Sequence, residues 1–153
     1  MKKKISIVTL LTAILLSLAA GSASAQYGYG DTFESPMEIW NPYTSSTNTV
    51  ILPIDSPNDN DWYVVNNASG SKYINFSVAV TPPSGIDLTL QLVRTDSNNN
   101  ITGTSYINYN GKGEVEAVGT DVQAGKKVYI RVISTGRDDY DPNRPYTLQF
   151  TKF

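Results

Sequence analysis

The residues best suited to chemistry in this sequence are acidic and amide side chains in one short segment. Asn58, Asp59 and Asp61 stand just before Trp62 and Tyr63, at the entrance of an apolar stretch. Carboxylate and amide oxygens gathered on a loop are the ligands that hard cations such as Ca²⁺ prefer. The same residue types also favour an Asx turn, in which their side chains accept backbone hydrogen bonds without a metal. The segment therefore predicts either a calcium site or a structural turn, and both interpretations stay open.

A second acidic segment contains Asp138, Asp139 and Asp141, with Arg137 and Arg144 beside it. Charged loops of this kind are usually solvated turns, and the neighbouring arginines can neutralise the acids. We therefore interpret this segment as a turn rather than as a metal site.

Glu114 and Glu116 have a spacing that could bring two carboxylates together for catalysis. Glu114 and Glu116 alternate and would share one face of a strand, as the two acids of a glycosidase must converge on one bond. Paired carboxylates on a solvated sheet face are common, and the sequence has no histidine and no cysteine. Nucleophilic triads and the usual zinc ligands are thereby excluded. We predict no catalytic residues and no enzymatic activity.

Tyrosine supplies the candidate ligand-binding surface. Tyr106 and Tyr109, together with Asn108 and Asn110, could form an exposed aromatic and polar face for a sugar or an extended peptide. In a strand, one of two neighbours such as Tyr106 and Ile107 normally points into the core, so cross-strand or core packing is the competing role. Trp62 heads an apolar stretch, and we expect it to anchor the core.

The elements that must position these residues are short strands rather than helices. Several stretches alternate with a period of two, for example Ile74, Phe76, Val78 and Val80. Eight strands are expected, over Thr49–Ile54, Trp62–Val65, Tyr73–Val80, Leu88–Arg94, Ile101–Ile107, Gly113–Val118, Val128–Ser134 and Tyr146–Lys152. Eight short strands in one domain predict an all-β fold, an antiparallel two-sheet sandwich that is jelly-roll-like or Greek-key. Asn110-Gly111 predicts a hairpin between the fifth and sixth strands.

The first 25 residues have the features of a secretory signal peptide. Three lysines precede an apolar run, and Ala23-Ser24-Ala25 offers a cleavage site. We expect residues 26–30 to form an N-terminal arm and residues 31–153 one β-sandwich domain, secreted and extracellular. Cleavage would leave nine basic residues against 14 acidic ones, a net charge of about −5. This balance argues against nucleic acid and, after cleavage, against a membrane as partners.

Four segments, taken in order, resemble the bacterial pre-peptidase C-terminal domain, whose relatives include the collagen-binding domains of clostridial collagenases. The segments are Asp31–Ile39, Asp59–Tyr63 (DNDWY), Ile86–Leu92 (IDLTLQL), and Ala124–Val132 (AGKKVYIRV) with Pro145–Leu148 (PYTL). The resemblance covers roughly residues 31–150 and rests on the order and spacing of the motifs rather than on any one of them. It implies a jelly-roll β-sandwich that is often appended to secreted peptidases.

The resemblance also implies site residues and partners. Calcium-binding members take ligands from an N-terminal acid, which Asp31 matches, and from the acid before the aromatic pair, which Asp61 matches; Asn58 falls where some members have a further acid. The arm lacks the extra glutamates of those members, so a full two-ion site is not expected. The candidate metal ligands are Asp31, Asn58, Asp59 and Asp61, and calcium is the cofactor that the resemblance implies for them. The expected partner is an extracellular protein or polysaccharide polymer; the alternative is a structural or export-accessory role beside another secreted protein such as a peptidase.

Overall fold

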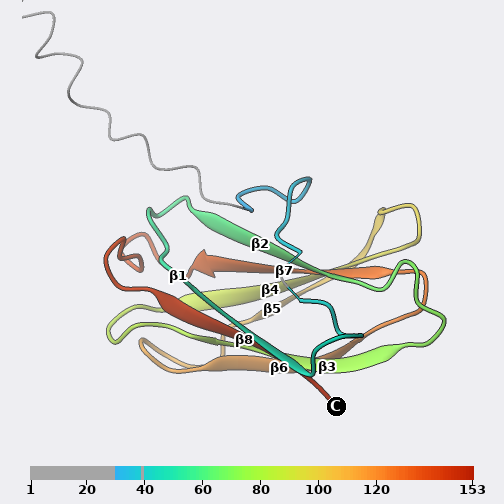
Figure 1. The fold of residues 1–153 in the computed structure, drawn as a ribbon. Helices are drawn as coiled ribbons and strands as arrows, with labels where there is room; N and C mark the ends of the chain where they lie inside the picture. The colour runs from blue at the N-terminus through green and yellow to red at the C-terminus, as the bar shows by residue number, and fades with distance from the viewer. Residues whose placement is uncertain (1–29, 39) are drawn as a thin grey trace, which may run out of the picture.

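The structure, a computed structural model, describes residues 30–38 and 40–153 (Figure 1). Within these residues it contains eight β-strands and no helix. The strands are β1 Thr47–Leu52, β2 Asn60–Asn66, β3 Ile74–Thr81, β4 Leu88–Thr95, β5 Ile101–Ile107, β6 Glu116–Val122, β7 Lys127–Ser134 and β8 Tyr146–Lys152. The predicted signal peptide and all but the last residue of the predicted arm lie outside the described residues. Within the described ranges, no helix is long and apolar enough to cross a membrane.

The strands form two four-stranded sheets that lie face to face. Sheet A has the order β2-β7-β4-β5 and sheet B the order β1-β8-β3-β6, and every pair of neighbouring strands is antiparallel. Consecutive strands therefore cross between the sheets, except for the β4–β5 hairpin. This order is the jelly-roll arrangement of two Greek keys. The predicted fold class, an antiparallel jelly-roll-like sandwich, is confirmed.

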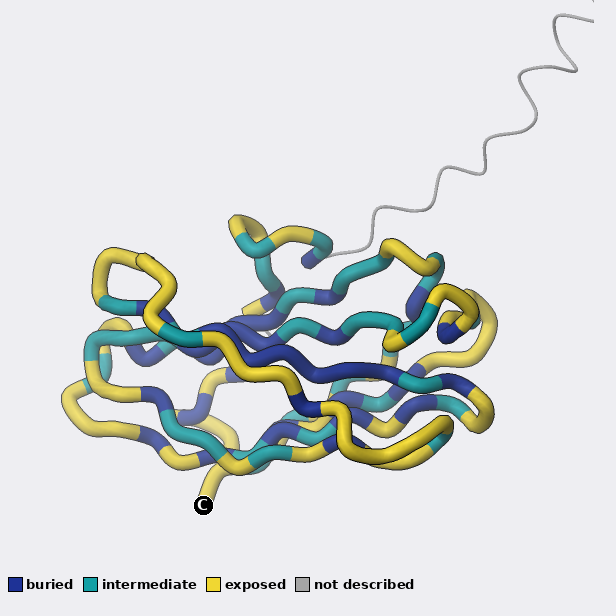
Figure 2. Tube along the Cα trace, turned by 180° about the vertical axis from the view of Figure 1, so that it is seen from behind, coloured by how far each residue is buried: buried dark blue, intermediate teal, exposed yellow. Residues whose placement is uncertain are grey.

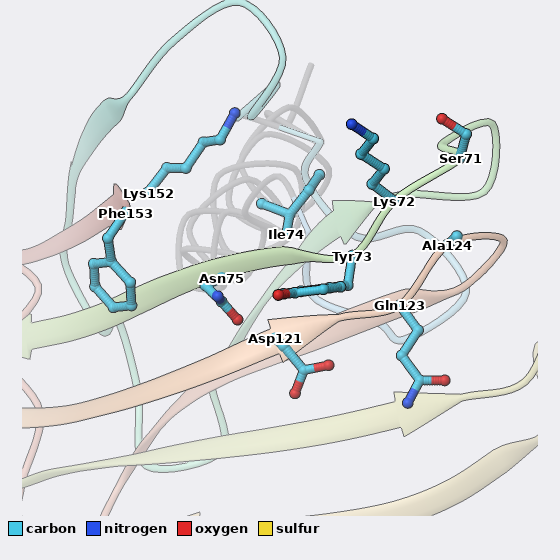
Figure 3. A pocket seen from close by; sticks show the side chains of 10 residues that line it. All are labelled: Ser71, Lys72, Tyr73, Ile74, Asn75, Asp121, Gln123, Ala124, Lys152 and Phe153. Carbon is cyan, nitrogen blue, oxygen red and sulfur yellow. The ribbon is translucent and has the colours of Figure 1, made fainter.

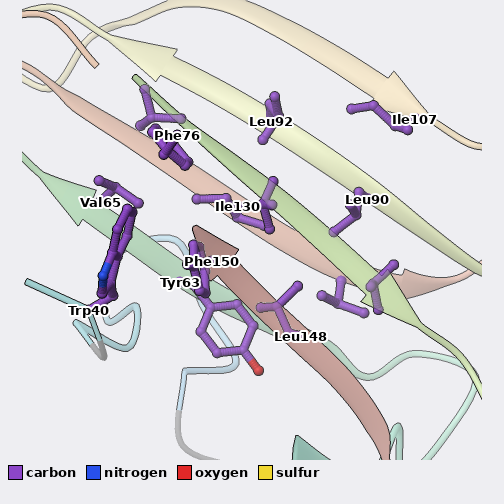
Figure 4. Close-up of a cluster of buried hydrophobic side chains, with 14 of the residues drawn as sticks. Trp40, Tyr63, Val65, Phe76, Leu90, Leu92, Ile107, Ile130, Leu148 and Phe150 are labelled. Carbon is purple, nitrogen blue, oxygen red and sulfur yellow. The ribbon is translucent and has the colours of Figure 1, made fainter. Parts of the chain in front are cut away.

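The core lies between the two sheets because apolar residues alternate with polar ones along most strands. Ile74, Phe76, Val78 and Val80 of β3 are all at most 5% exposed. They face apolar residues of β4, β7 and β8, and Figure 4 shows Leu90, Leu92, Ile130, Leu148 and Phe150 gathered in this layer. Figure 2 shows buried residues along the middle of the strands and exposed ones in the loops. Because the described part contains no cysteine, this packing and its hydrogen bonds must supply the stability.

Residues 30–37, before β1, lie along the free edge of β2 and are hydrogen-bonded to it (Figure 1). The N–H of Trp62 donates to the carbonyl of Gly30 at 2.7 Å, and the N–H of Met37 donates to the carbonyl of Trp62 at 2.8 Å. Gly30 has a φ of 97°. A Cβ at this position would stand 2.8 Å from the Trp62 carbonyl oxygen, so the close approach requires glycine. This contact brings Asp31, the next residue, to the start of β2.

The hairpin predicted at Asn110-Gly111 is wrong. The strand before it, β5, pairs with β4 in sheet A, whereas β6 pairs with β3 in sheet B. The connection is thus a crossover between sheets. The sixth strand also begins three residues later than predicted and runs on to Val122, because its inward residues continue opposite Ile74 of β3.

The expectation that Trp62 anchors the core is also wrong. Its neighbour Tyr63 is fully buried between the sheets, so strand alternation places Trp62 on the outer face of sheet A, where it is partly buried. Trp40, which lies before β1, supplies the buried indole instead. Its ring is 2% exposed and stacks on Phe150 with the ring centroids 5.5 Å apart.

Candidate functional site

One row of side chains crosses the outer face of sheet A on four neighbouring strands. Trp62 of β2 stands opposite Arg131 of β7, which stands opposite Gln91 of β4, which in turn stands opposite Tyr106 of β5. Side chains in directly opposed positions share one face of a sheet and lie within contact distance. The sheet register therefore lines up two aromatic rings, a guanidinium group and an amide.

The members of this row are joined by hydrogen bonds. The side-chain amide of Gln91 donates to the Tyr106 hydroxyl at 2.9 Å, and Arg131 donates to the side-chain oxygen of Gln91 at 3.1 Å. Arg131 also donates to the Asn60 side chain and lies over the Trp62 ring, 5.2 Å from its centroid. The hydroxyl of Tyr106 is thereby held, while the residue stays 61% exposed. Tyr106 presents a positioned aromatic surface to solvent.

Tyr109, the second candidate, lies in the loop after β5 and is 81% exposed. The backbone around it is fixed from beneath, because the N–H groups of Tyr109 and Asn110 both donate to one oxygen of Glu116, at 2.9 and 2.5 Å. Ile107, between the two tyrosines, is 3% exposed and points into the core. The competing core role is thus taken by Ile107, and both tyrosines lie at the surface.

The other half of this outer face is covered. Phe33, in the segment before β1, contacts the rings of Trp62 and Tyr129 with centroid distances of 5.4 and 4.3 Å. With Val64 and Val93 these rings form a small apolar cluster outside the sandwich. The cover leaves the β5 side of sheet A, with Tyr106, as the open side.

Three of the four predicted metal ligands meet at one end of the sandwich. Ligand oxygens of Asp31, Asp59 and Asp61 all lie within 4.8 Å of one another. Asp31 comes from the segment hydrogen-bonded to Trp62, whereas Asp59 and Asp61 flank the start of β2. Asn58 precedes them and is exposed, and its carbonyl accepts a hydrogen bond from the Asn60 side chain at 2.7 Å.

The turn interpretation of this segment also has support in the hydrogen bonds. The carboxylate of Asp59 accepts the N–H of Asp55 at 2.7 Å and the N–H of Asn60 at 2.8 Å, so it fixes the backbone of the turn, although neither is the N–H two residues further on that defines an Asx turn. Asp61 accepts the Tyr146 hydroxyl at 2.6 Å, and Tyr146 meets Tyr63 at 2.5 Å between hydroxyl oxygens. Asp61 is 4% exposed and the two tyrosines at most 1%. Sequence reasoning missed this buried chain because Tyr146 is 85 residues from Asp61.

At this end of the sandwich several carboxyl groups lie close together, and that of Asp61 is buried. Burial raises the pKa of Asp61 to about 7; the hydrogen bond from Tyr146 opposes the rise, and the charges of Asp59, Asp31 and Asp55 add to it. Burial, and then the charge of Asp59, also raises the pKa of Asp55. Burial raises the pKa of Tyr63 and of Tyr146 as well, so both hydroxyls stay protonated. A cation beside Asp61 would favour its ionised form.

The donor set fits a hard cation. Three carboxylates whose oxygens lie within 4.8 Å of one another can contact one ion, and Ca²⁺ takes oxygen ligands at 2.3–2.6 Å. Each oxygen that accepts one hydrogen bond keeps a further lone pair. The turn and the metal site are therefore compatible in this geometry.

The remaining acidic candidates have structural partners. Glu116 is 1% exposed at the start of β6, whereas Glu114 lies before the strand and is exposed, so the two do not form a pair on one solvent face. Asp139 is 7% exposed and pairs with Lys112 at 2.7 Å rather than with an arginine. Asp141 pairs with Arg144 at 2.6 Å, as the interpretation of this segment as a neutralised turn expects.

Comparison with known proteins finds neither a matching family model nor a matching curated protein. Similar solved structures include the pre-peptidase C-terminal domain of a Bacillus anthracis collagenase, with a TM-score of 0.43 and 20% identity over 70% of this chain and 87% of that domain. The mitogen derived from Yersinia pseudotuberculosis has a TM-score of 0.44 and 15% identity, covering 69% of this chain and 82% of that one. The globular domain of zebrafish complement 1qA has a TM-score of 0.37 and 18% identity, covering 60% and 68%. The collagenase domain bears the name of the family that the four sequence motifs resemble.

Proposed function

We propose that this protein is a secreted, non-catalytic binding module that attaches to an extracellular polymer, either a protein fibre or a cell-wall or polysaccharide component. The contact surface is the open side of sheet A, with Tyr106 and Tyr109 as its aromatic contacts. Tyr106 belongs to β5, an edge strand of sheet A, and an extended polymer could lie across this edge.

The observation that carries this proposal is that Tyr106 is exposed to solvent while its hydroxyl is held by a hydrogen bond. An aromatic side chain that is 61% exposed costs little conformational entropy on binding if it is already held, and the Gln91 hydrogen bond holds it. Such preorganised aromatic residues are frequent energetic centres of binding surfaces. Tyr109, which is exposed on a loop that Glu116 fixes, is the second aromatic contact that we assign to this surface.

The structural roles of the acidic side chains support a non-catalytic function. Glu116 accepts two backbone hydrogen bonds in a buried position, and Asp139 and Asp141 are neutralised by cations. With histidine and cysteine absent from the sequence, the usual bases and nucleophile activators are missing.

Calcium is part of the proposal as a structural ligand. Asp31, Asp59 and Asp61 would hold it, with the side chain of Asn58 as a further oxygen ligand. The ion would supply positive charge at the crowded carboxylates and tie the segment before β1 to β2.

Retention on insoluble polymers tests the binding surface. The purified protein is expected to sediment with at least one of collagen, peptidoglycan and insoluble glycans, and Tyr106→Ala and Tyr109→Ala should each reduce the bound fraction several-fold. Ile51→Ala is the matched control, because Ile51 is 62% exposed but lies on β1 at the edge of sheet B. Retention on none of these polymers, or equal retention of all variants, would contradict the proposal.

The secreted location has its own test. N-terminal sequencing of the protein recovered from the culture medium is expected to begin at Gln26. A protein found only inside the cells, with Met1 intact, would contradict this part of the proposal.

A further inference from the structure

A second surface, away from Tyr106, has the form of a ligand site. An open groove of about 870 Å³ lies where β3 begins and where β6 and β8 end. Its principal side chains are Tyr73, Asn75, Asp121, Gln123 and Phe153 (Figure 3). These strands belong to sheet B, so the groove and the Tyr106 surface are on different sheets.

Strand alternation places the polar and aromatic residues of the groove on the outside of sheet B. Ile74 and Val122 are 5% and 1% exposed and point into the core, so their neighbours Asn75 and Asp121 point outward. Asn75 and Asp121 are directly opposed in the register of β3 and β6. The N–H of Phe153 donates to the Asn75 carbonyl at 3.2 Å, which sets Phe153 beside the same row. The core beneath therefore positions the groove.

Two aromatic rings flank the polar centre of the groove. Tyr73 is 66% exposed and Phe153 is 73% exposed. Figure 3 shows Asn75 between them, with the Tyr73 hydroxyl directed toward Asn75, with Asp121 on the neighbouring strand β6 and with Gln123 just after the end of that strand. Exposed rings offer flat apolar faces, and the amides and the carboxylate between them offer both donors and acceptors.

The groove is lined by few charged side chains. One carboxylate, that of Asp121, stands against Lys72 and Lys152. Lys152 is engaged, because its ammonium group donates to the Pro42 carbonyl at 2.9 Å. The groove has therefore no concentrated charge for a phosphate or a polyanion, and its chemistry suits a neutral ligand.

The strand order disfavours an extended peptide as that ligand. The nearer free edge of sheet B lies on the far side of β6, whereas β3, at the centre of the groove, is hydrogen-bonded on both sides, to β6 and to β8, so that a peptide backbone cannot add to it. Recognition there depends on side chains alone. A pyranose ring has an apolar C–H face that can stack on an aromatic ring and hydroxyl groups that can bond to amides and carboxylates.

We propose that this groove binds a neutral saccharide chain, with sugar rings stacked on Tyr73 and Phe153 and with their hydroxyl groups bonded to Asn75, Asp121 and Gln123. The site is separate from the polymer surface proposed on sheet A, and neither depends on the other. It would give the domain a second point of attachment.

Affinity electrophoresis in native gels tests the site. The protein is run through gels that contain glucomannan, xyloglucan, galactan, gelatin or no added polymer. At least one neutral polysaccharide is expected to retard the wild type, and the apparent dissociation constant should rise about tenfold for Tyr73→Ala, for Phe153→Ala and for Asn75→Ala. Ile51→Ala, an exposed apolar residue of β1 outside the lining of the groove, is the control and should migrate as the wild type. Equal thermal unfolding of the variants confirms that the fold is intact.

The outcomes separate this proposal from the one on sheet A. Loss of retardation in Tyr106→Ala but not in Tyr73→Ala would place the sugar on sheet A and overturn the groove site. Retardation by none of the polysaccharides would also overturn it, even if Tyr106 proved necessary for retention on collagen. Retardation by gelatin alone, lost in Tyr73→Ala, would show a peptide site and would contradict the saccharide assignment.

Discussion

Asp61 is a carboxylic acid almost completely removed from water at one end of the core. Its environment supplies one strong hydrogen bond, from Tyr146 at 2.6 Å, and several like charges. A buried carboxylate with one donor and acidic neighbours is costly in its ionised form, because desolvation and repulsion act in the same direction. At the residue scale, this end of the molecule therefore depends on protonation, on the tyrosine donor and on any bound cation.

Tyr146→Phe is expected to lower the free energy of unfolding by about 1–3 kcal/mol, because a buried carboxylate loses its donor and Tyr63 loses its partner. Urea denaturation at pH 7 measures the change. Tyr109→Phe, at an 81% exposed position, is the control and should stay within about 0.5 kcal/mol of the wild type. Equal stability of Tyr146→Phe and the wild type would contradict the role of the tyrosine.

The raised pKa of Asp61 predicts a pH dependence of stability in calcium-free buffer. The folded pKa of about 7 exceeds the ordinary value of 3.8, so between these values the folded state binds more protons than the unfolded state. Stability from this residue is therefore greatest at low pH and is lost as the pH rises toward 7, by about 3 kcal/mol between pH 5 and pH 8.

Urea denaturation at the two pH values, with a chelator present, measures this difference. Asp96 and Asp141 have lowered pKa values and titrate below this window, so they do not mask it. Asp61→Asn should remove most of the slope. A wild type as stable at pH 8 as at pH 5 would show that Asp61 is ionised without cost.

The connection between β5 and β6 takes its shape from a side chain rather than from a hairpin. Because the chain crosses from sheet A to sheet B, the backbone of Tyr109 and Asn110 cannot form the hydrogen bonds of a two-residue hairpin. Glu116, at the start of β6, replaces them by accepting both N–H groups with one carboxylate oxygen. A buried acid thus shapes the loop that presents Tyr109.

Glu116→Ala is expected to destabilise the protein by about 1–2 kcal/mol and to speed amide hydrogen exchange at Tyr109 and Asn110. The loss is moderate because the other carboxylate oxygen of Glu116 is buried and accepts no hydrogen bond within the described residues. Glu114→Ala, two residues earlier and exposed, is the matched control and should change neither quantity. Identical exchange in the two variants would argue against this role of Glu116.

At the scale of the whole molecule, the jelly roll brings chain segments together that have no local reason to meet. Gly30 contacts Trp62, which sets Asp31 beside Asp59 and Asp61. The β8 residue Tyr146 closes this cluster from the opposite sheet. A ligand held there would join the first described segment, sheet A and sheet B, in a fold without cysteine.

Calcium is therefore expected to raise the melting temperature by several degrees, since a ligand present at a hundred times its Kd adds about 2.7 kcal/mol to stability. Thermal unfolding with excess calcium and with chelator measures the shift, which should be larger at pH 8 than at pH 5 because protons compete for Asp61. Asp59→Asn should abolish the shift, whereas Asp138→Asn, exposed in the other acidic segment, should keep it. Identical melting of the wild type with calcium and with chelator would remove calcium from the proposal.

The strands and their inward faces followed from the sequence because side-chain alternation is a local property. The period of two in β3, β4, β7 and β8 predicted which residues would be buried, and these residues form the core. The acidic loop before Trp62 was likewise visible as a candidate site, since its residues are adjacent in the chain. The signal peptide and the secreted location remain predictions of the sequence alone.

Tertiary structure decided everything that depends on which strands become neighbours. Strand pairing joins residues far apart in the chain, and a local signal such as Asn110-Gly111 was overruled when β6 found its partner in sheet B. As a result of the same pairing, Glu116 is buried and Trp62 lies on the outer face of sheet A. The pairing also brings Tyr146 into hydrogen-bond contact with Asp61 and forms the groove between Tyr73 and Phe153. Alternation states only that a side chain faces one side or the other; the order of strands in the two sheets determines what it meets there.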